Sequence, residues 1–166
     1  MTEQFILDTM KAQGRADAMN LAARAIDMTP TEIIAQERKI PAWNPKGDYS
    51  DPTKTPIGTP VRDGGQVWIL LQLHNAAHYP YRPTQLRSLW GLAHSKDPKT
   101  AKPWVPSYGT SGLYMLDECC TYVNPKDGLE HVNRNLWDNN EYPPYTLNVE
   151  NRWEDLGTVA EVQGNE

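Results

Sequence analysis

Apolar residues in the first 40 positions recur with the spacing of a helix. Five of them fall at i, i+3, i+4, i+7 and i+8, namely Ala18, Leu21, Ala22, Ala25 and Ile26. This spacing places them on one helical face. Phe5, Ile6 and Met10 extend the pattern toward the N-terminus, and Gly14 is a candidate break.

A second, short helix is predicted from residue 29. Thr29 suits the N-cap, Pro30 suits the first turn, and Glu32 completes a capping box, whereas Pro41 ends the segment. Two helices of this length bury little surface by themselves. We therefore expect residues 1–42 either to pack on the remainder of the chain or to act as a docking or oligomerisation segment.

Beyond residue 56 the apolar pattern changes to that of strands. The turn Asp63-Gly64 precedes the apolar run 67–71, which is typical of a β-hairpin. A second hairpin is predicted from residues 118–123 and 130–137, joined by a turn at 124–128. The stretches 43–56 and 95–112 are rich in turn-forming residues and are predicted to be linkers, with an ordered irregular segment as the alternative for the first.

The two hairpin regions are copies of one pattern. Each has a strand, a polar turn, a Tyr-Pro pair and a closing tryptophan. Equivalent positions are Val67 and Val132, Leu71 and Leu136, Asn75 and Asn140, Tyr79 and Tyr142, and Trp90 and Trp153. Such a repeat indicates duplicated small modules. The predicted fold class is therefore α+β, with a short N-terminal helical segment followed by two small, mostly antiparallel β modules at 57–94 and 113–157, and a flexible tail at 158–166.

Charge and hydropathy argue against two classes of partner. The 166 residues carry a formal net charge of −5, so no basic surface for nucleic acid is expected. No stretch approaches the roughly 18 apolar residues of a membrane span, and no membrane insertion is expected. The N-terminus also lacks the basic and apolar segments of a secretion signal.

The aromatic residues point toward recognition. Six Trp and eight Tyr stand against a single Phe, and all fourteen lie at or after Trp43. Trp and Tyr combine a flat apolar surface with a polar group, which suits half-exposed binding surfaces. The alternative is that these rings fill the thin cores of small β modules.

The hairpin residues 117–122, the pair Tyr142-Pro143 and the closing Arg152-Trp153 carry a family resemblance. In the first copy, residues 58–61, Trp68, Tyr79-Pro80 and Trp90 stand at the same places. This pattern resembles the small chitin- or cellulose-binding modules of carbohydrate-binding families 5 and 12, over residues 57–93 and 113–157. The second copy departs from it, because Asn133 replaces the strand tryptophan and Trp137 follows four residues later.

The chain as a whole, including Asp48-Tyr49 and the run 138–144, also resembles small proteins encoded near the tail genes of tailed bacteriophages. This resemblance implies a virion location on the tail tip, a fibre or the capsid, and attachment to other virion proteins through residues 1–42. A homo-oligomer is a further expectation. The implied ligand is a glycan of the bacterial surface.

Sugar recognition needs flat rings that stack on pyranose faces and polar groups that fix their orientation. The candidate carbohydrate-binding residues are Trp68, Tyr79, Trp90, Trp137, Asn140, Tyr142 and Trp153. Asn75, Asn139 and Glu141 are additional hydrogen-bonding candidates. For Trp90 and Trp153 in particular, a role in the core is an equally strong expectation.

Catalysis is not expected. The nucleophile-elbow, phosphate-loop and His-Glu-x-x-His motifs are missing, and the adjacent carboxylates Asp117 and Glu118 point to opposite faces of a strand. His74 and His78 are too few for a metal site, so neither a metal nor a cofactor is expected.

Cys119 and Cys120 are adjacent in the sequence, and a bridge between neighbouring residues requires a strained peptide, so both are expected as free, buried thiols.

Two alternatives to a carbohydrate-binding virion component remain. One is a structural decoration or tail-assembly protein, and the other is the wall-binding subunit of a lytic system.

Overall fold

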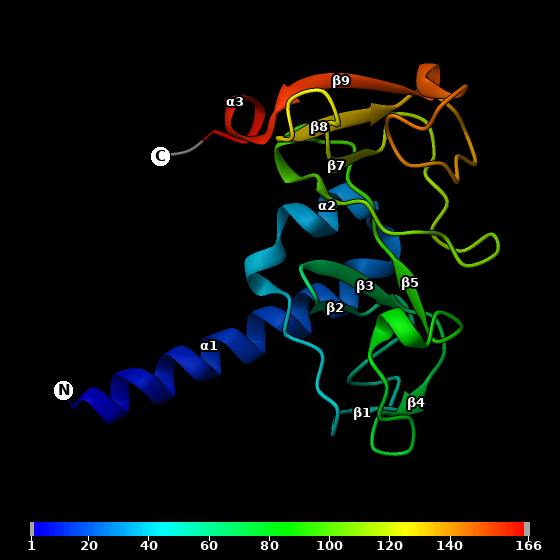
Figure 1. The fold of residues 1–166 in the computed structure, drawn as a ribbon. Helices are drawn as coiled ribbons and strands as arrows, with labels where there is room; N and C mark the ends of the chain where they lie inside the picture. Colours follow the sequence, from blue (N-terminus) through cyan, green and yellow to red (C-terminus); the bar gives the residue numbers. More distant parts are fainter. Residues whose placement is uncertain (1, 165–166) are drawn as a thin grey trace. The chain divides into compact units, whose positions relative to one another are not determined.

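The computed structural model describes residues 2–164 and divides into two compact units, Met1–Gly91 and Leu92–Glu166 (Figure 1). A long N-terminal helix is followed by several small sheets, which confirms the α+β class. The division falls three residues before the expected end of the first module. No helix of the described part of the chain is both long and apolar enough to cross a membrane.

The helical elements of the first unit are α1 (Glu3–Arg24), η1 (Ala25–Asp27), α2 (Pro30–Ala35), η2 (Glu37–Lys39) and η3 (Pro83–Gln85). The predicted capping box at the start of α2 is confirmed, because Thr29 Oγ1 accepts from Glu32 N and Glu32 Oε2 accepts from Thr29 N. Gly14 does not break α1. A single exposed glycine costs a helix only about 1 kcal/mol, which is too little to end it.

The predicted apolar face of α1 is buried only near the C-terminal end of the helix. Leu21, Ala22 and Ala25 are buried, but Ile26 is 64% exposed. The expected position of Ile26 on this face was wrong, because the chain tightens into the 3₁₀ turn η1 at Ala25 and the helical register changes there. Ile33, Ile34 and Ile40 complete the buried helical part.

Two sheets follow in the first unit. One has the order β2-β3-β5, formed by β2 (Pro60–Asp63), β3 (Gln66–Leu70) and β5 (Trp90–Leu92). The other pairs β1 (Asp48–Tyr49) with β4 (His74–Asn75) in antiparallel fashion. The predicted hairpin is formed by β2 and β3. Its turn contains Gly64 and Gly65, whose φ angles of 60° and 75° favour glycine.

The second unit contains one sheet of order β6-β7-β8-β9. Its elements are η4 (Pro98–Thr100), β6 (Lys102–Pro103), β7 (Cys119–Val123), β8 (Glu130–Asn135), η5 (Glu150–Arg152), β9 (Trp153–Thr158) and α3 (Val159–Gln163). Cys119 and Cys120 are free and buried, as expected, and belong to different apolar clusters. Adjacent strand residues point to opposite faces, which separates the two thiols.

The repeat seen in the sequence is also a repeat of hydrogen bonds. In each unit the residue directly after the central strand bonds to the residue before the closing tryptophan. The last residue of that strand accepts a bond from a residue with positive φ that precedes the hairpin. The matching bonds are Leu71 N to Leu89 O and Leu136 N to Arg152 O, both 2.8 Å, and Gly58 N to Leu70 O at 2.9 Å and Asp117 N to Asn135 O at 2.8 Å.

The repeat extends into both expected linkers. Trp43 N donates to Arg62 O at 2.7 Å, and Trp104 N donates to Thr121 O at 3.0 Å, so each tryptophan enters its unit alongside the first hairpin strand. Strands β1 and β6 also lie in these stretches and pair with β4 and β7. The sequence did not indicate these strands, because short two-residue pairings in Pro-rich sequence leave no hydrophobic period to detect.

The tail expected at 158–166 forms a helix over most of its length. Thr158 caps α3 by accepting from Glu161 N, and Gln163 Nε2 donates to the carbonyls of Pro98 and Ala101 at 3.2 and 3.1 Å. Val159 and Val162 pack on the buried cluster around Ala101. Residues 165 and 166 lie outside the described part of the chain.

The two central strands have different core chemistry. In β3 the inward positions are Trp68 and Leu70, whereas the equivalent positions of β8 are Asn133 and Asn135. All four are at most 1% exposed. The second unit thus replaces apolar side chains by buried amides, and buried amides require hydrogen-bond partners.

Candidate functional site

Two exposed aromatic rings lie on the loop between β8 and β9. Trp137 is 47% exposed and Tyr142 is 37% exposed. The guanidinium carbon of Arg152 lies 4.8 Å from the centroid of the Trp137 ring and 4.9 Å from that of Tyr142. One cation therefore contacts both rings, and we call these three residues the aromatic platform.

The backbone of Trp137 is held by a buried amide. The side chain of Asn135 donates through Nδ2 to Trp137 O and to Met115 O, and its Oδ1 accepts from Trp137 N at 3.3 Å. Asn135 is completely buried in β8. The exposed ring is thus attached to a residue of the central strand.

Tyr142 is held by a second amide and by the closing tryptophan. Tyr142 N donates to Asn140 Oδ1 at 3.1 Å, and Trp153 Nε1 donates to Tyr142 O at 2.8 Å. Asn140 Nδ2 in turn donates to Asn135 Oδ1 at 2.9 Å. A continuous network of buried groups therefore fixes the backbone at both rings.

The structure brings together three of the predicted site residues at this point and places others in the cores. Trp137 and Tyr142 are exposed in the platform, and Asn140 lies beneath them with 0% exposure. Asn140 also makes two backbone bonds with Tyr114. It supports the platform and does not reach its surface.

The three other tryptophan candidates are buried. Trp68, Trp90 and Trp153 are 1%, 0% and 7% exposed. The Trp90 ring meets Tyr49 edge-on at 5.1 Å, and the Trp153 ring meets Tyr114 in a similar way at 5.2 Å. These rings fill the cores of the two units and do not present a face to a ligand.

The first unit lacks an equivalent platform. Tyr79 is 49% exposed, and its ring lies 6.2 Å from that of His74. The matched hydrogen bonds place Gln72 and Leu89 where the second unit has Trp137 and Arg152. Of the three platform residues, only Tyr142 therefore has a counterpart of the same type in the first copy, namely Tyr79.

Polar residues flank the platform rings in the sequence. Asp138, Asn139 and Glu141 are all exposed. Asp138 Oδ1 accepts from Leu116 N at 3.0 Å, and Asn139 has a φ of 55°, so the loop turns sharply between the two rings. Aromatic surface beside carboxylate and amide oxygens can stack on an apolar ring face and accept hydrogen bonds from hydroxyl groups.

Sequence reasoning did not identify Arg152 as a site residue. In the sequence it is only the neighbour of the closing tryptophan. Its contact with both rings depends on the connection between β8 and β9 folding back, so that η5 brings residue 152 to rings that lie ten and fifteen residues earlier. No short motif signals such a contact, although Arg is a common partner of Trp and Tyr rings.

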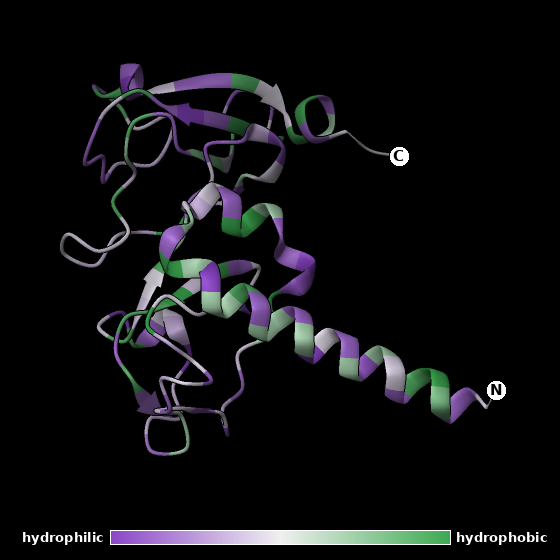
Figure 2. Ribbon diagram, turned by 180° about the vertical axis from the view of Figure 1, so that it is seen from behind, coloured by the Kyte–Doolittle hydropathy of each residue, from purple (hydrophilic) through white to green (hydrophobic). Residues whose placement is uncertain are grey.

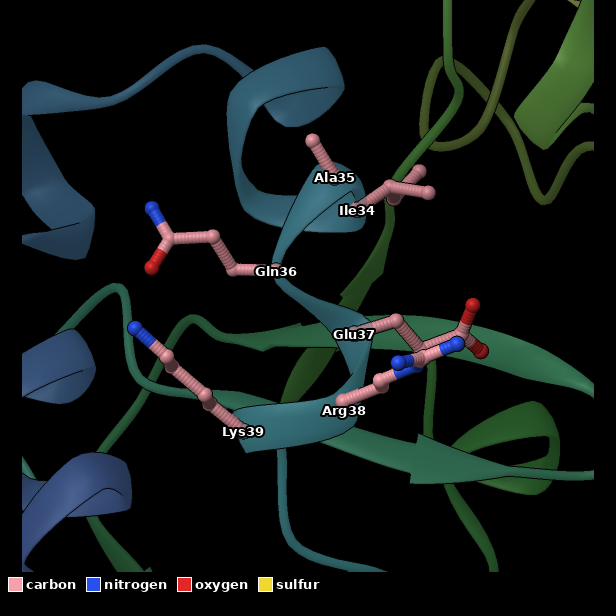
Figure 3. Close-up of a pocket in the computed structure, with 6 residues that line it drawn as sticks. All are labelled: Ile34, Ala35, Gln36, Glu37, Arg38 and Lys39. Atoms are coloured by element: carbon pink, nitrogen blue, oxygen red, sulfur yellow. The ribbon is translucent and has the colours of Figure 1, made fainter.

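An open hollow of about 480 Å³ lies over α2 and η2 (Figure 3). It is lined by Ile34, Ala35, Gln36, Glu37, Arg38 and Lys39. Gln36 and Lys39 point to one side of the chain, whereas Glu37 and Arg38 point to the other (Figure 3). The polar groups do not converge, and no aromatic side chain lines the hollow.

A buried histidine lies between two carboxylates in the second unit. His131 Nδ1 bonds to Asp155 Oδ1 at 2.8 Å, and Nε2 bonds to Asp127 Oδ2 at 2.7 Å. The bond to Asp155 raises the pKa of His131, although burial opposes this. Because both ring nitrogens are engaged, the group links β8 to its neighbours and is not placed to exchange protons with a substrate.

The thiols and the remaining histidines do not form a site either. Burial raises the pKa of Cys119 to about 11 and that of Cys120 well above its usual value, so both stay protonated and unreactive. His74 bonds through Nδ1 to Gln72 O. Between residues 2 and 164, no group of three or more His, Cys, Asp or Glu side chains could hold a metal ion.

Comparison of the chain with family models, with curated proteins and with solved structures finds no match.

Proposed function

We propose that this protein is a non-catalytic carbohydrate-binding component of a phage virion and that its aromatic platform contacts host surface glycans. The observation that carries the proposal is the pair of exposed rings, Trp137 and Tyr142, whose backbone is fixed by buried amides. Large exposed rings cost free energy in water, so an exposed pair held in place suggests a ligand that covers it.

Preorganisation supports this function. A ring that is already held when the ligand arrives loses little conformational freedom on binding, and the affinity rises accordingly. Arg152 restrains both rings from one side and leaves about half of the Trp137 surface accessible. Loose surface aromatics would lack this restraint.

The chemistry around the rings favours sugars over flat apolar ligands. Asp138, Asn139 and Glu141 are exposed neighbours of the two rings in the same loop and carry side-chain acceptors. A pyranose offers a C–H face to the rings and hydroxyl donors to these acceptors, whereas an aromatic ligand would leave the acceptors without new partners.

The virion assignment rests on the resemblance of the chain to small phage tail-region proteins. In this proposal the helical segment 1–42 attaches the protein to other virion components, and the second unit faces the host. No catalytic group is required, since adsorption needs only reversible binding.

The test is a glycan array of bacterial surface and cell-wall polysaccharides. The wild-type protein is compared with Trp137→Ala and Tyr142→Ala, and with Tyr108→Ala as a control, because Tyr108 is 69% exposed and lies away from the platform in the sequence. We expect binding by the wild type and the control, and loss of binding in both platform variants. Absence of binding by the wild type would instead favour a purely structural virion role.

A further inference from the structure

Two carboxylates hold a histidine between them in the second unit. His131 of β8 bonds through Nδ1 to Asp155 of β9 at 2.8 Å and through Nε2 to Asp127 of the β7–β8 turn at 2.7 Å. Figure 2 shows β8 as hydrophilic over most of its length, so these bonds lie on a polar strand. We call Asp127, His131 and Asp155 the histidine clamp.

The two bonds of the clamp require a protonated ring. A neutral imidazole carries one N–H and one lone pair, whereas an ionised carboxylate only accepts hydrogen bonds. His131 therefore donates to both carboxylates only as an imidazolium cation. The bond to Asp155 raises the pKa of His131, and the bonds from Leu129 N and the His131 ring lower the pKa of Asp127, as a cation between two anions requires.

The neighbouring elements bring no competing charge to the ring. Among the described residues, the two carboxylates are the only charged side chains that bond to His131. In the register of the sheet, β7 places Tyr122 and β9 places Thr158 opposite His131. The connection between β8 and β9 contributes Tyr145, whose pKa is raised by burial and by Asp155, so its hydroxyl keeps its proton and donates to Asp155.

The charged residues that are nearest in the sequence are directed elsewhere. Lys126 is exposed in the turn. Glu130 and Arg134 lie on the opposite face of β8, where Glu130 bonds to Thr121 and Arg134 pairs with Glu154 at 3.6 Å. Because the carboxylates of the clamp stay ionised at neutral pH, its ring is the only member whose charge changes there.

The two arms of the clamp are held unequally. Asp155 accepts three further hydrogen bonds, namely from Tyr145 Oη at 2.8 Å, Gly157 N at 2.9 Å and Asn124 Nδ2 at 3.2 Å. Asp127 is held from outside the clamp by Leu129 N at 2.9 Å, and its side chain is 41% exposed. The Asp127 arm is therefore the weaker of the two and the one that solvent reaches more easily.

We propose that the histidine clamp is a pH-dependent latch on the β7–β8 turn. While the ring is charged, both arms are closed and the turn is tied to β8. When the ring is neutral, Nδ1 keeps its proton for Asp155, and the lone pair of Nε2 repels the carboxylate of Asp127. The Asp127 arm then opens, and Leu129 N, which bonds to the same carboxylate, loses this partner. The proposal does not depend on the proposed function.

The test is a titration of the full chain between about pH 5 and 9, followed by NMR of the His131 ring nitrogens and of the backbone amides. We expect both ring nitrogens to be protonated at the acid end. Only Nε2 should lose its proton, with a midpoint above 6.5. The amide signal of Leu129 should shift with the same midpoint, whereas those of Trp137 and Tyr142, whose amides bond to Asn side chains outside the clamp, should not.

Asp127→Asn tests the chemistry of the latch. The amide of Asn can donate to an unprotonated Nε2, so the turn stays tied when the ring is neutral. We expect the pH-dependent shift of Leu129 to disappear and the midpoint of His131 to fall. Tyr145→Phe is the matched control, because it removes a bond to Asp155 but leaves both arms of the clamp, and it should keep the shift of Leu129.

Three results would overturn the proposal. The first is a His131 ring with only one protonated nitrogen at the acid end of the titration. The second is a Leu129 signal that does not follow the midpoint of the ring. The third is a Leu129 signal that titrates in Asp127→Asn as it does in the wild type. The wild type alone decides the first two, whether or not the variant folds.

Discussion

Replacing Asn135 by Leu tests whether the buried amides of the second unit hold the platform. The substitution introduces the residue that occupies the equivalent position, Leu70, in the first unit. Asn135 makes hydrogen bonds to the backbone of Met115, to the backbone of Trp137 and to the side chain of Asn140. Leu cannot make any of them.

Two opposing effects decide the magnitude. A fully buried leucine gains about 2 kcal/mol of apolar burial. Against this, Asn140 Nδ2 is left fully buried and Met115 O partly buried without their partner, at a cost of about 1–3 kcal/mol each. The loss exceeds the gain, and we expect the free energy of unfolding to fall by about 2 kcal/mol.

Urea denaturation of the full chain measures this change, and hydrogen exchange of peptides from β8 and β3 reports the two units separately. Asn151→Leu, an exposed asparagine on η5, is the control. The decrease should be confined to the second unit. An unchanged or increased stability of Asn135→Leu would refute the reasoning. It would mean that the hydrogen bonds of Asn135 stabilise the second unit no more than the apolar burial of a leucine does.

Three further predictions concern the cores. Trp153→Phe removes the hydrogen bond to Tyr142 O, so the free energy of unfolding in urea denaturation should fall by about 2 kcal/mol and Tyr142 should be held less firmly. Unchanged stability would contradict the assigned bond. His131, whose pKa is raised by Asp155, contributes stability below pH 6.5 that is lost as the pH rises through its raised pKa, so melting temperatures should fall on the alkaline side and this slope should disappear in His131→Gln. Gly58→Ala places a side chain at φ 98° and 3.3 Å from the backbone of η1, so we expect a loss of about 2 kcal/mol, and a neutral result would show that the turn can adjust.

The strands and the duplication could be predicted from the sequence because the buried residues of a strand recur with a regular spacing. Alignment of Val67 with Val132 places both residues, which are completely buried, on the central strands of the two units. The capping signal at Thr29 was equally local and was confirmed. Such features depend on neighbours within a few residues, which a single sequence displays directly.

The remaining features depend on contacts between distant residues. Trp43 and Trp104 enter their units by one hydrogen bond each, and Pro-rich flanks hide the pairing. Arg152 belongs to the candidate site only because the connection between β8 and β9 folds back and places it over two rings ten and fifteen residues away. Whether a tryptophan such as Trp90 belongs to the core or to a surface is likewise decided by tertiary packing, because Trp suits both environments.

The central claim is that Trp137 and Tyr142 form a carbohydrate-binding surface and that the buried tryptophans do not. Titration of the full chain with an oligosaccharide found on the array, followed by the NMR signals of the indole N–H groups, tests it most directly. We predict a saturable shift of the Trp137 signal, smaller or no shifts of Trp68 and Trp90, and loss of the response in Tyr142→Ala. Saturable shifts confined to the other tryptophans, or binding that survives Trp137→Ala unchanged, would contradict the account.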